Sequence, residues 1–524
     1  MLKLVLGASG SGKTTLLYAR IRARAEAGKR SILLVPEQFT SSTEARIYRE
    51  LGDALSGMVE SYSFTSLAEH ILAALGGAAV QTLTDAGRAV LVRRALEELQ
   101  DNVHYYYRHR RSAAFCQMAA ETIDELKSAG LSGQQLQELA RDCGTESAKL
   151  GELALIFQGY ESLLAGTGMD PADRLELAAD RLEAALARDE LPDFLREREV
   201  FIDEFDTFNA PKKRLMGAML AALPAVTVAL CEDGAPMQPG DLELFSGAKQ
   251  VAAQLRQLAR KNGAQVAAPE LLRRDLRHKD APGLAALTEL LETGSCTPPE
   301  SAPELRLFAA ASREEEARCA AAAIRRLMRQ GVRCGKIAVV CRDISLYRAA
   351  VRYEFRMAEI PLYCDEPTTP EFSAPATAVR ALLALLRGAD MTEQLTVLAK
   401  TGLCDLTEPE VCALENYAYT WSPNAAAWRA EFTKSPRGFG DAELTEEDTQ
   451  NLTRAENARK KLVTAVDTLR GRVRSANAEQ ISRALYFCLK ELGAEGQQAA
   501  QVEDIRTARG IPAAEEAARE WNVV

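Results

Sequence analysis

The chain opens with an apolar run and a glycine-rich loop: Leu2-Lys3-Leu4-Val5-Leu6-Gly7-Ala8-Ser9-Gly10-Ser11-Gly12-Lys13-Thr14. Residues 2–6 are typical of a short buried strand, and a helical run begins at Thr15. The order is therefore strand, GxxxxGK[ST] loop and helix, which is the order that a P-loop requires. This stretch predicts that the chain begins with a parallel α/β domain built around the loop.

The residue types of the loop suit the phosphates of ATP and a magnesium ion. The glycines permit backbone conformations that a Cβ would forbid, so that successive N–H groups can cradle phosphate oxygens. Lys13 would reach the β- and γ-phosphates and the Thr14 hydroxyl would hold Mg²⁺. We therefore expect nucleotide binding by Gly7, Ala8, Ser9, Gly10, Ser11, Gly12, Lys13 and Thr14. The alternative is a glycine-rich turn that binds nothing.

Composition limits the kind of protein this is. The 524 residues carry a formal net charge of −10, so a nucleic-acid site must be a local groove rather than the whole surface. The eleven cysteines are scattered and include no CxxC pair, which favours reduced thiols in a cytoplasmic protein over disulfides or zinc. The sequence has no run of 18 apolar residues, so we expect no membrane span.

Further β–α units follow the P-loop. Ser31–Val35 and Met58–Tyr62 are typical of strands, and each is followed by polar residues and a helix. Such a series implies a parallel sheet with helices on both faces. Because ligands of these sheets lie at the carboxyl ends of the strands, we expect the P-loop, residues 36–40 and residues 61–66 to meet at one edge.

A later strand ends in two acidic residues. Glu199-Val200-Phe201-Ile202 continues into Asp203-Glu204, which is the form of a Walker B element. Asp203 would hold Mg²⁺ through water, and Glu204 would orient the attacking water. The alternative is an acidic strand end or helix cap without chemistry. Val226–Cys231 is expected to be a further strand.

Amphipathic helices separate the first strands from this one. We expect them at Asp85–Gln100, Ala113–Ser128, Glu146–Leu164 and Pro171–Leu186, with Asp170 as the cap of the last. Between the first two, His104-Tyr105-Tyr106-Tyr107-Arg108-His109-Arg110-Arg111 mixes rings with basic groups. This mixture suits single-stranded nucleic acid, although a solvated helix end with packed tyrosines is an equal alternative.

The second half predicts a second, incomplete β–α lobe and then helices only. Strands are expected at Leu305–Ala309, Lys336–Arg342 and Ile360–Tyr363, and Ser312 is expected to cap a helix. The fold class is thus α/β. We expect a sheet domain at 1–84 and 191–295, a helical insertion at 85–190, a second lobe at 300–371 and a helical domain at 372–524.

The set of motifs, in this order, resembles superfamily 1 helicases of the UvrD-like group and, within it, the AddB (RexB) family of helicase/nuclease components. The residues that carry the resemblance are 7–14, 33–40, 200–208, 312–316 with 337–342, and 400–403 with 414–417. The resemblance implies RecA-like lobes with 1B-like and 2B-like helical insertions. It also implies a role in processing DNA double-strand breaks for recombinational repair.

The same resemblance implies partners and contacts. The family works as a heterodimer with the A-type subunit of the AddAB (RexAB) complex, which acts on single-stranded DNA and duplex ends. Contacts to single-stranded DNA would fall on Gln38, Thr40, Ser63 and Thr65, for which loop polarity and helix capping are the alternative. The family's nuclease and four-cysteine iron–sulfur cluster lie C-terminal to the matched region, so neither is expected in this chain.

Departures from the family pattern bear on catalysis. Helicases of this group have a glutamine that senses the γ-phosphate after the Asp-Glu strand, and Gln238 here lies in a sequence that does not match that motif well. The arginine-bearing Asn-Tyr-Arg-Ser element expected near the start of the second lobe is missing. Because arginines of the second lobe stabilise transition-state charge, we expect ATP binding with weak or no hydrolysis by this chain alone. The alternative function is a nucleotide-gated protein scaffold without DNA binding or ATPase activity. A small-molecule P-loop kinase is disfavoured, since it would have no use for two helical insertions.

Overall fold

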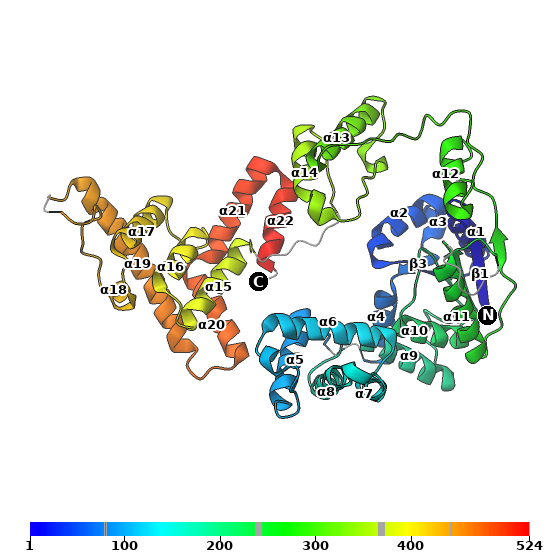
Figure 1. Cartoon of the computed structure of the whole chain (residues 1–524), viewed down its shortest axis with the longest axis horizontal. Helices are drawn as coiled ribbons and strands as arrows, with labels where there is room; N and C mark the ends of the chain where they lie inside the picture. Colours follow the sequence, from blue (N-terminus) through cyan, green and yellow to red (C-terminus); the bar gives the residue numbers. More distant parts are fainter. Residues whose placement is uncertain (78, 80, 236–243, 365–371, 441–442, 523–524) are drawn as a thin grey trace. The chain divides into compact units, whose positions relative to one another are not determined.

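The computed structural model describes residues 1–77, 79, 81–235, 244–364, 372–440 and 443–522 (Figure 1). The chain forms two compact units, Met1–Phe308 and Ala309–Val524. Gln238, the candidate sensor glutamine, lies outside the described residues. Within the described ranges, every helix is too short or too polar to cross a lipid bilayer.

The first unit is built on a parallel sheet, which confirms the predicted α/β class. In the described residues its strand order is β3-β2-β4-β5-β1-β6, and every pairing is parallel. The strands are β1 (Leu2–Gly7), β2 (Ser31–Leu34), β3 (Val59–Tyr62), β4 (Glu199–Ile202), β5 (Ala225–Cys231) and β6 (Glu270–Leu272). The first five follow the predicted positions, whereas β6 was not predicted.

Helices cover both faces of this sheet. One face carries α1 (Lys13–Glu26) and α2 (Thr40–Leu51), which pack on inward residues such as Val5 and Phe201. The other face carries α4 (Phe64–Leu75), α9 (Pro171–Ala187), α10 (Ala210–Ala222) and α11 (Ser246–Lys261). Successive residues of a strand point to opposite faces, and the inner strands β1, β2, β4 and β5 are buried almost throughout because helices cover both sides. Two further helices are α3 (Asp53–Ser56) and α12 (Pro282–Thr293).

A helical bundle is inserted between α4 and α9. It contains α5 (Asp85–Glu98), α6 (Ala113–Ala129), α7 (Gly133–Arg141) and α8 (Ser147–Leu164), which enclose their own apolar core. The helices predicted here are present, and α7 is an addition. The two ends of the bundle are joined by a bridge between Thr82 and Met169, so the insertion leaves and returns at one point.

Asp170 ties the insertion to the sheet layer. It precedes α9 and forms the predicted cap, and its carboxylate also accepts hydrogen bonds from the Tyr160 hydroxyl at 2.6 Å and the Lys127 amine at 2.8 Å. Asp173 binds the same amine at 2.9 Å. The buried polar groups are therefore paired, as burial requires.

The aromatic and basic segment at the tip of the bundle is built around one carboxylate. Glu152 accepts backbone N–H bonds from His104, Tyr105 and Tyr106 at 2.7–3.1 Å. The Tyr106 ring lies 5.1 Å from the ring of Phe115 and joins the core of the bundle. Residues 104–106 therefore form a packed connection between helices, as the interpretation of a helix end with packed tyrosines expects.

The strands predicted for the second lobe are wrong. Residues 305–309, 337–341 and 360–363 are not in strands, and no sheet forms in the described residues of 309–524. Leu307 and Val340 are 99% and 91% exposed, and no segment of the described chain forms a strand ladder with the stretches that contain them. An apolar run becomes a strand only when a ladder partner satisfies its backbone groups. The capped helix after Ser312 is present, as α13 (Arg313–Arg329), and packs on α14 (Ile344–Met357).

From residue 372 the described chain is helical, as predicted. The helices are α15 (Ala374–Leu386), α16 (Met391–Lys400), α17 (Glu408–Trp421), α18 (Ala425–Arg429), α19 (Glu446–Arg472), α20 (Ala478–Glu491), α21 (Ala494–Arg509) and α22 (Ile511–Asn522). Trp428 is the largest fully buried side chain of their shared core. Its indole N–H donates to Thr392 at 2.8 Å, and its carbonyl accepts from Arg459 at 2.8 Å.

Replacing Trp428 by alanine should cost about 3–5 kcal/mol of the free energy of unfolding of the second unit, because a large cavity would remain. All three tryptophans lie in that unit, so the fluorescence of the other two during urea unfolding reports on it alone. Tyr419→Ala is the control, since Tyr419 is 88% exposed and its loss should cost less than about 0.5 kcal/mol. Equal midpoints for the two variants would contradict this assignment of the core.

Candidate functional site

A hollow of about 440 Å³ lies at the carboxyl ends of β1, β4 and β5. It is lined by Ser9, Gly10, Gly12, Lys13, Thr14, Thr15, Arg46, Asp203, Glu204, Phe205, Asp206, Ala229, Cys231, Leu276 and Arg277. The parallel pairing of β4 and β1 with β5 carries the acidic strand end and the glycine-rich loop to the same edge. The structure thus brings together two motifs that lie far apart in the sequence.

The loop depends on the absence of side chains at its glycines. Gly10 and Gly12 have φ of +79° and +92°, in the left-handed region that favours glycine. A Cβ on Gly7 would lie 2.4 Å from Ser11 Oγ and 2.7 Å from the carbonyl oxygen of Leu272. Only glycine fits at these three positions, because the backbone there either turns left-handed or touches its neighbours.

Lys13 is held inside the loop. Its amine donates to the carbonyl oxygens of Gly7 at 2.7 Å and Ala8 at 2.9 Å, and its burial lowers the pKa of the amine. Ser11 Oγ is buried and has no hydrogen-bond partner among the described residues. A buried hydroxyl without a partner is costly, so an oxygen-rich ligand in the loop would stabilise it.

Thr14 and Asp203 lie in direct contact. The Thr14 hydroxyl donates a hydrogen bond to the Asp203 carboxylate, which is 5% exposed. Burial raises the pKa of Asp203, and this hydrogen bond opposes the rise. A hydroxyl and a carboxylate side by side are the oxygen donors that Mg²⁺ prefers. The pair therefore fits a magnesium ion bound next to the loop.

Glu204 follows Asp203 in a strained backbone conformation. Its φ is +65°, and its N–H donates to Asp203 Oδ1 at 3.0 Å. Burial and the neighbouring charge of Asp203 both raise the pKa of Glu204. A non-glycine residue in this region costs free energy, and strained residues of this kind cluster at functional sites. In this conformation the Glu204 side chain lines the hollow.

Two arginines of the hollow were not predicted. Arg46 comes from α2, with its guanidinium 4.8 Å from the centre of the Tyr18 ring, and Arg277 comes from the segment after β6. No spacing links Arg46 to the loop in the sequence. Arg277 belongs to the basic run Arg273-Arg274-Asp275-Leu276-Arg277-His278, but its proline-dotted surroundings are typical of a linker. The short strand β6 is what carries it to the loop.

The four candidate DNA contacts lie at the carboxyl ends of β2 and β3. Gln38 and Thr65 are exposed. Thr40 donates to the Glu37 carbonyl at 2.9 Å, and the buried Ser63 caps α4 through the N–H of Ser66 at 3.1 Å. Ser63 is therefore engaged in helix capping, while Gln38 and Thr65 present polar surface.

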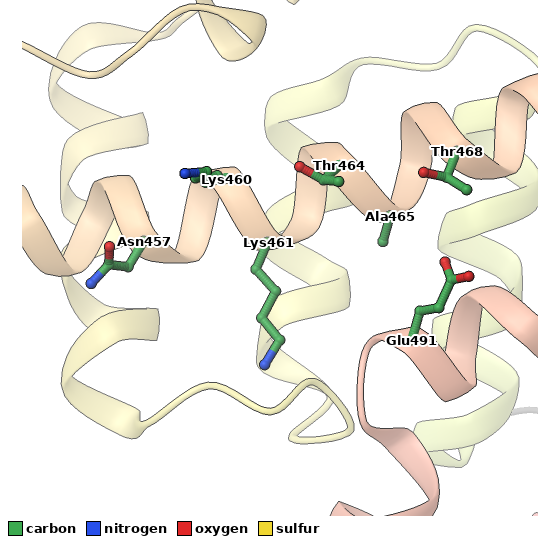
Figure 2. A pocket seen from close by; sticks show the side chains of 7 residues that line it. All are labelled: Asn457, Lys460, Lys461, Thr464, Ala465, Thr468 and Glu491. Atoms are coloured by element: carbon green, nitrogen blue, oxygen red, sulfur yellow. The ribbon is translucent and has the colours of Figure 1, made fainter.

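The second unit has a hollow of its own, of about 550 Å³, along α19 (Figure 2). Lys461 and Ala465 project from one side of α19 toward the end of α20 that carries Glu491. The Lys461 amine binds Asp405 at 2.6 Å, and Glu491 binds Arg472 at 2.6 Å. Lys461 and Glu491, two charged residues that line this hollow, are thus paired with other residues of the same unit.

The parallel sheet, the loop and the acidic strand end define the first unit as a P-loop domain of the α/β class. A sequence model of the family described as "ADDB, N-terminal" matches residues 4–288, more than half of the chain. The chain therefore belongs to the AddB, N-terminal family. The resemblance seen in its motifs is confirmed.

Curated relatives are named as the B-type subunit of an ATP-dependent helicase/deoxyribonuclease. The protein of Moorella thermoacetica is 30% identical over 99% of this chain and 46% of its own length. That of Desulforudis audaxviator is 30% identical over 100% and 46%, and that of Symbiobacterium thermophilum 30% identical over 82% and 38%. The chain spans slightly less than half the length of the curated relatives it matches.

The strain at Glu204 can be measured by comparing two variants that both remove its carboxylate. Glu204→Gly should be more stable than Glu204→Ala by about 0.5–1 kcal/mol, because only the alanine variant keeps a Cβ in the left-handed conformation. Hydrogen exchange of the β4 and β5 amides gives the opening free energy of the sheet. At an unstrained position the order would be reversed, so a more stable alanine variant would refute the assignment.

Proposed function

We propose that this chain is the helicase-like, ATP- and DNA-binding part of an AddB-type component that works with its A-type partner in a heterodimeric helicase/nuclease complex. Such a complex processes DNA double-strand breaks for recombinational repair. The observation that carries the proposal is the shared hollow in which Lys13 and Thr14 meet Asp203 and Glu204. The names of the relatives support the complex and the existence of a partner chain.

The proposed nucleotide is ATP with Mg²⁺, bound on Gly7, Ala8, Ser9, Gly10, Ser11, Gly12, Lys13 and Thr14. Lys13 would exchange its two carbonyl partners for phosphate oxygens, and Thr14 and Asp203 would hold the metal. Bound Mg²⁺ neutralises charge on the phosphates. Glu204, with the raised pKa that burial gives it, would orient a water at the edge of the hollow.

Weak or no hydrolysis by this chain alone is part of the same proposal. The related helicases place arginines of their second lobe on the nucleotide, and an arginine finger can raise the rate about 10³–10⁵-fold. Here the described residues of 309–371 form no sheet that could present such groups. Free thiols at all eleven cysteines support a cytoplasmic location as a further part of the proposal.

Lys13→Ala should weaken ATP–Mg²⁺ binding at least about tenfold, because it removes a charged donor to the phosphates. Titration calorimetry measures the change in affinity. Lys29→Ala is the matched control, since Lys29 is an exposed lysine just beyond the other end of α1, and it should bind like the wild type. If the wild-type chain takes up no ATP, the loop is structural, and the chain is better interpreted as a scaffold that docks DNA or a partner protein without a nucleotide.

Single-stranded DNA binding should weaken linearly with the logarithm of salt concentration, because phosphate contacts release counterions. The double variant Gln38→Ala/Thr65→Ala should lose several-fold in affinity without a change of slope, since both side chains are uncharged. Fluorescence anisotropy of a labelled oligonucleotide gives both quantities. Gln117→Ala/Thr122→Ala, on α6 in the inserted bundle, is the control. A chain that shows no binding at low salt would favour the protein-only scaffold.

A further inference from the structure

A hollow of about 800 Å³ lies at the tip of the inserted bundle, and we call it the tip hollow. It is formed by the connection between α5 and α6, the first turns of α6 and the start of α8. The residues that line it include His104, Tyr105, Arg108, His109, Met118 and Lys149. None of these residues belongs to the nucleotide site or to the four candidate DNA contacts. The tip hollow is therefore a separate candidate site.

The backbone beside the tip hollow is fixed by one carboxylate. Glu152 accepts N–H bonds from His104, Tyr105 and Tyr106 at 2.7–3.1 Å. The Tyr106 ring in turn packs 5.1 Å from the ring of Phe115, in the core of the bundle. A backbone that is already ordered limits the entropy lost when its side chains bind a ligand. The side chains of the tip hollow are thus presented from a preorganised connection.

Tyr105 exposes its ring at this hollow although its backbone is anchored. The residue is 58% exposed. Its ring is nearly perpendicular to the Tyr106 ring, at 80° with the centroids 4.9 Å apart, so Tyr106 is not stacked on it. Met118 of α6 lines the same hollow and is 56% exposed. An exposed ring that is held in place is a surface on which an unpaired base can stack.

The charge around the tip hollow is positive. Residues 102–120 contain three arginines and neither Asp nor Glu, in a chain whose net charge is −10. Arg108 and Lys149 line the hollow, and none of its described lining residues is acidic. Lys149 pairs with Glu146 at 3.6 Å in a solvent-exposed contact, which is the kind that contributes little. Both cations can therefore bind an anionic ligand.

We propose that the tip hollow binds single-stranded nucleic acid, with a base stacked on Tyr105 and the adjoining phosphates on Arg108 and Lys149. The inference rests on the proposed DNA binding and deepens it by adding a contact site on the inserted bundle. Rings beside cations suit a single strand, because every base has a π-face and the backbone is anionic. The bases of a duplex are stacked on one another, so the ring of Tyr105 selects for unpaired bases.

A protein surface is the competing occupant, since interfaces between proteins are also enriched in tyrosine, methionine and arginine. Such interfaces match positive with negative groups across the contact. The described lining of the tip hollow carries cations without carboxylates. This uniform charge fits the polyanionic backbone of a nucleic acid better than a protein surface of mixed charge.

The stacking contact is tested by fluorescence anisotropy of the full chain with a labelled oligothymidylate and with a labelled blunt duplex. Tyr105→Ala should weaken single-strand binding at least about fivefold, because the base loses its ring, and should leave duplex binding unchanged. Tyr105→Phe should bind the single strand like the wild type, since it keeps the ring. Tyr419→Ala is the matched control, as Tyr419 is an exposed tyrosine of the second unit.

The phosphate contact is tested by the salt dependence of the same binding. Arg108→Ala should reduce the slope of log affinity against log salt by about 1 and weaken single-strand and duplex binding alike. Arg141→Ala should keep the wild-type slope, because Arg141 lies at the end of α7 in the same bundle and does not line the tip hollow. Equal slopes for these two variants would contradict the phosphate contact.

The outcomes separate this inference from the proposed function. If Tyr105→Ala binds the single strand as tightly as Tyr419→Ala, the inference is overturned, and DNA binding through Gln38 and Thr65 still stands. Equal losses on single strand and duplex in Tyr105→Ala would assign Tyr105 a structural role. An equal loss in Tyr105→Phe would refute stacking. A wild-type chain that binds no DNA at low salt would refute the proposed DNA binding as well, and would favour a protein surface as the occupant.

Discussion

The close approach of backbone to backbone around Gly7, Gly10 and Gly12 is the constraint on which the first unit depends. Gly7 has no room for a Cβ between Ser11 and the carbonyl of Leu272, which belongs to β6. Gly10 and Gly12 turn left-handed and allow the Leu276–Arg277 turn to lie against the loop. Because these residues have no side chains, Gly10 and Gly12 can line the hollow, and Gly7 can lie against β6. Any larger residue would have to displace one of these neighbours.

The order of the strands places the glycine-rich loop next to the acidic end of β4. β1 lies between β5 and β6, and β4 lies on the far side of β5. Loops from neighbouring strands therefore converge, and a hydroxyl from α1 touches a carboxylate that follows β4. The inserted bundle does not disturb this order, because its two ends meet at the bridge between Thr82 and Met169. The inserted bundle can be long because only its two ends connect to the sheet layer.

Parts of the architecture follow from local sequence alone. The strand before the loop, the acidic strand end and the capped start of α9 at Asp170 were predicted correctly, because each has a strong local signal. The strands expected at 305–309, 336–342 and 360–363 failed for the opposite reason. Their apolar residues follow the pattern of a buried strand. A strand, however, forms only when a second segment pairs with its backbone, and no segment of the described chain pairs with these three.

The candidate site divides in the same way. The sequence by itself determined the chemistry of residues 7–14 and of Asp203 and Glu204, since a glycine, a lysine or a carboxylate has that chemistry wherever it lies. Only the tertiary structure decided that Arg46 and Arg277 line the same hollow, because α2 and the short strand β6 carry them there. The capping of α4 by Ser63 is different, because it is a local contact with Ser66 and was one of the two interpretations of the sequence. Contacts between distant segments depend on packing and strand order, which no short motif encodes.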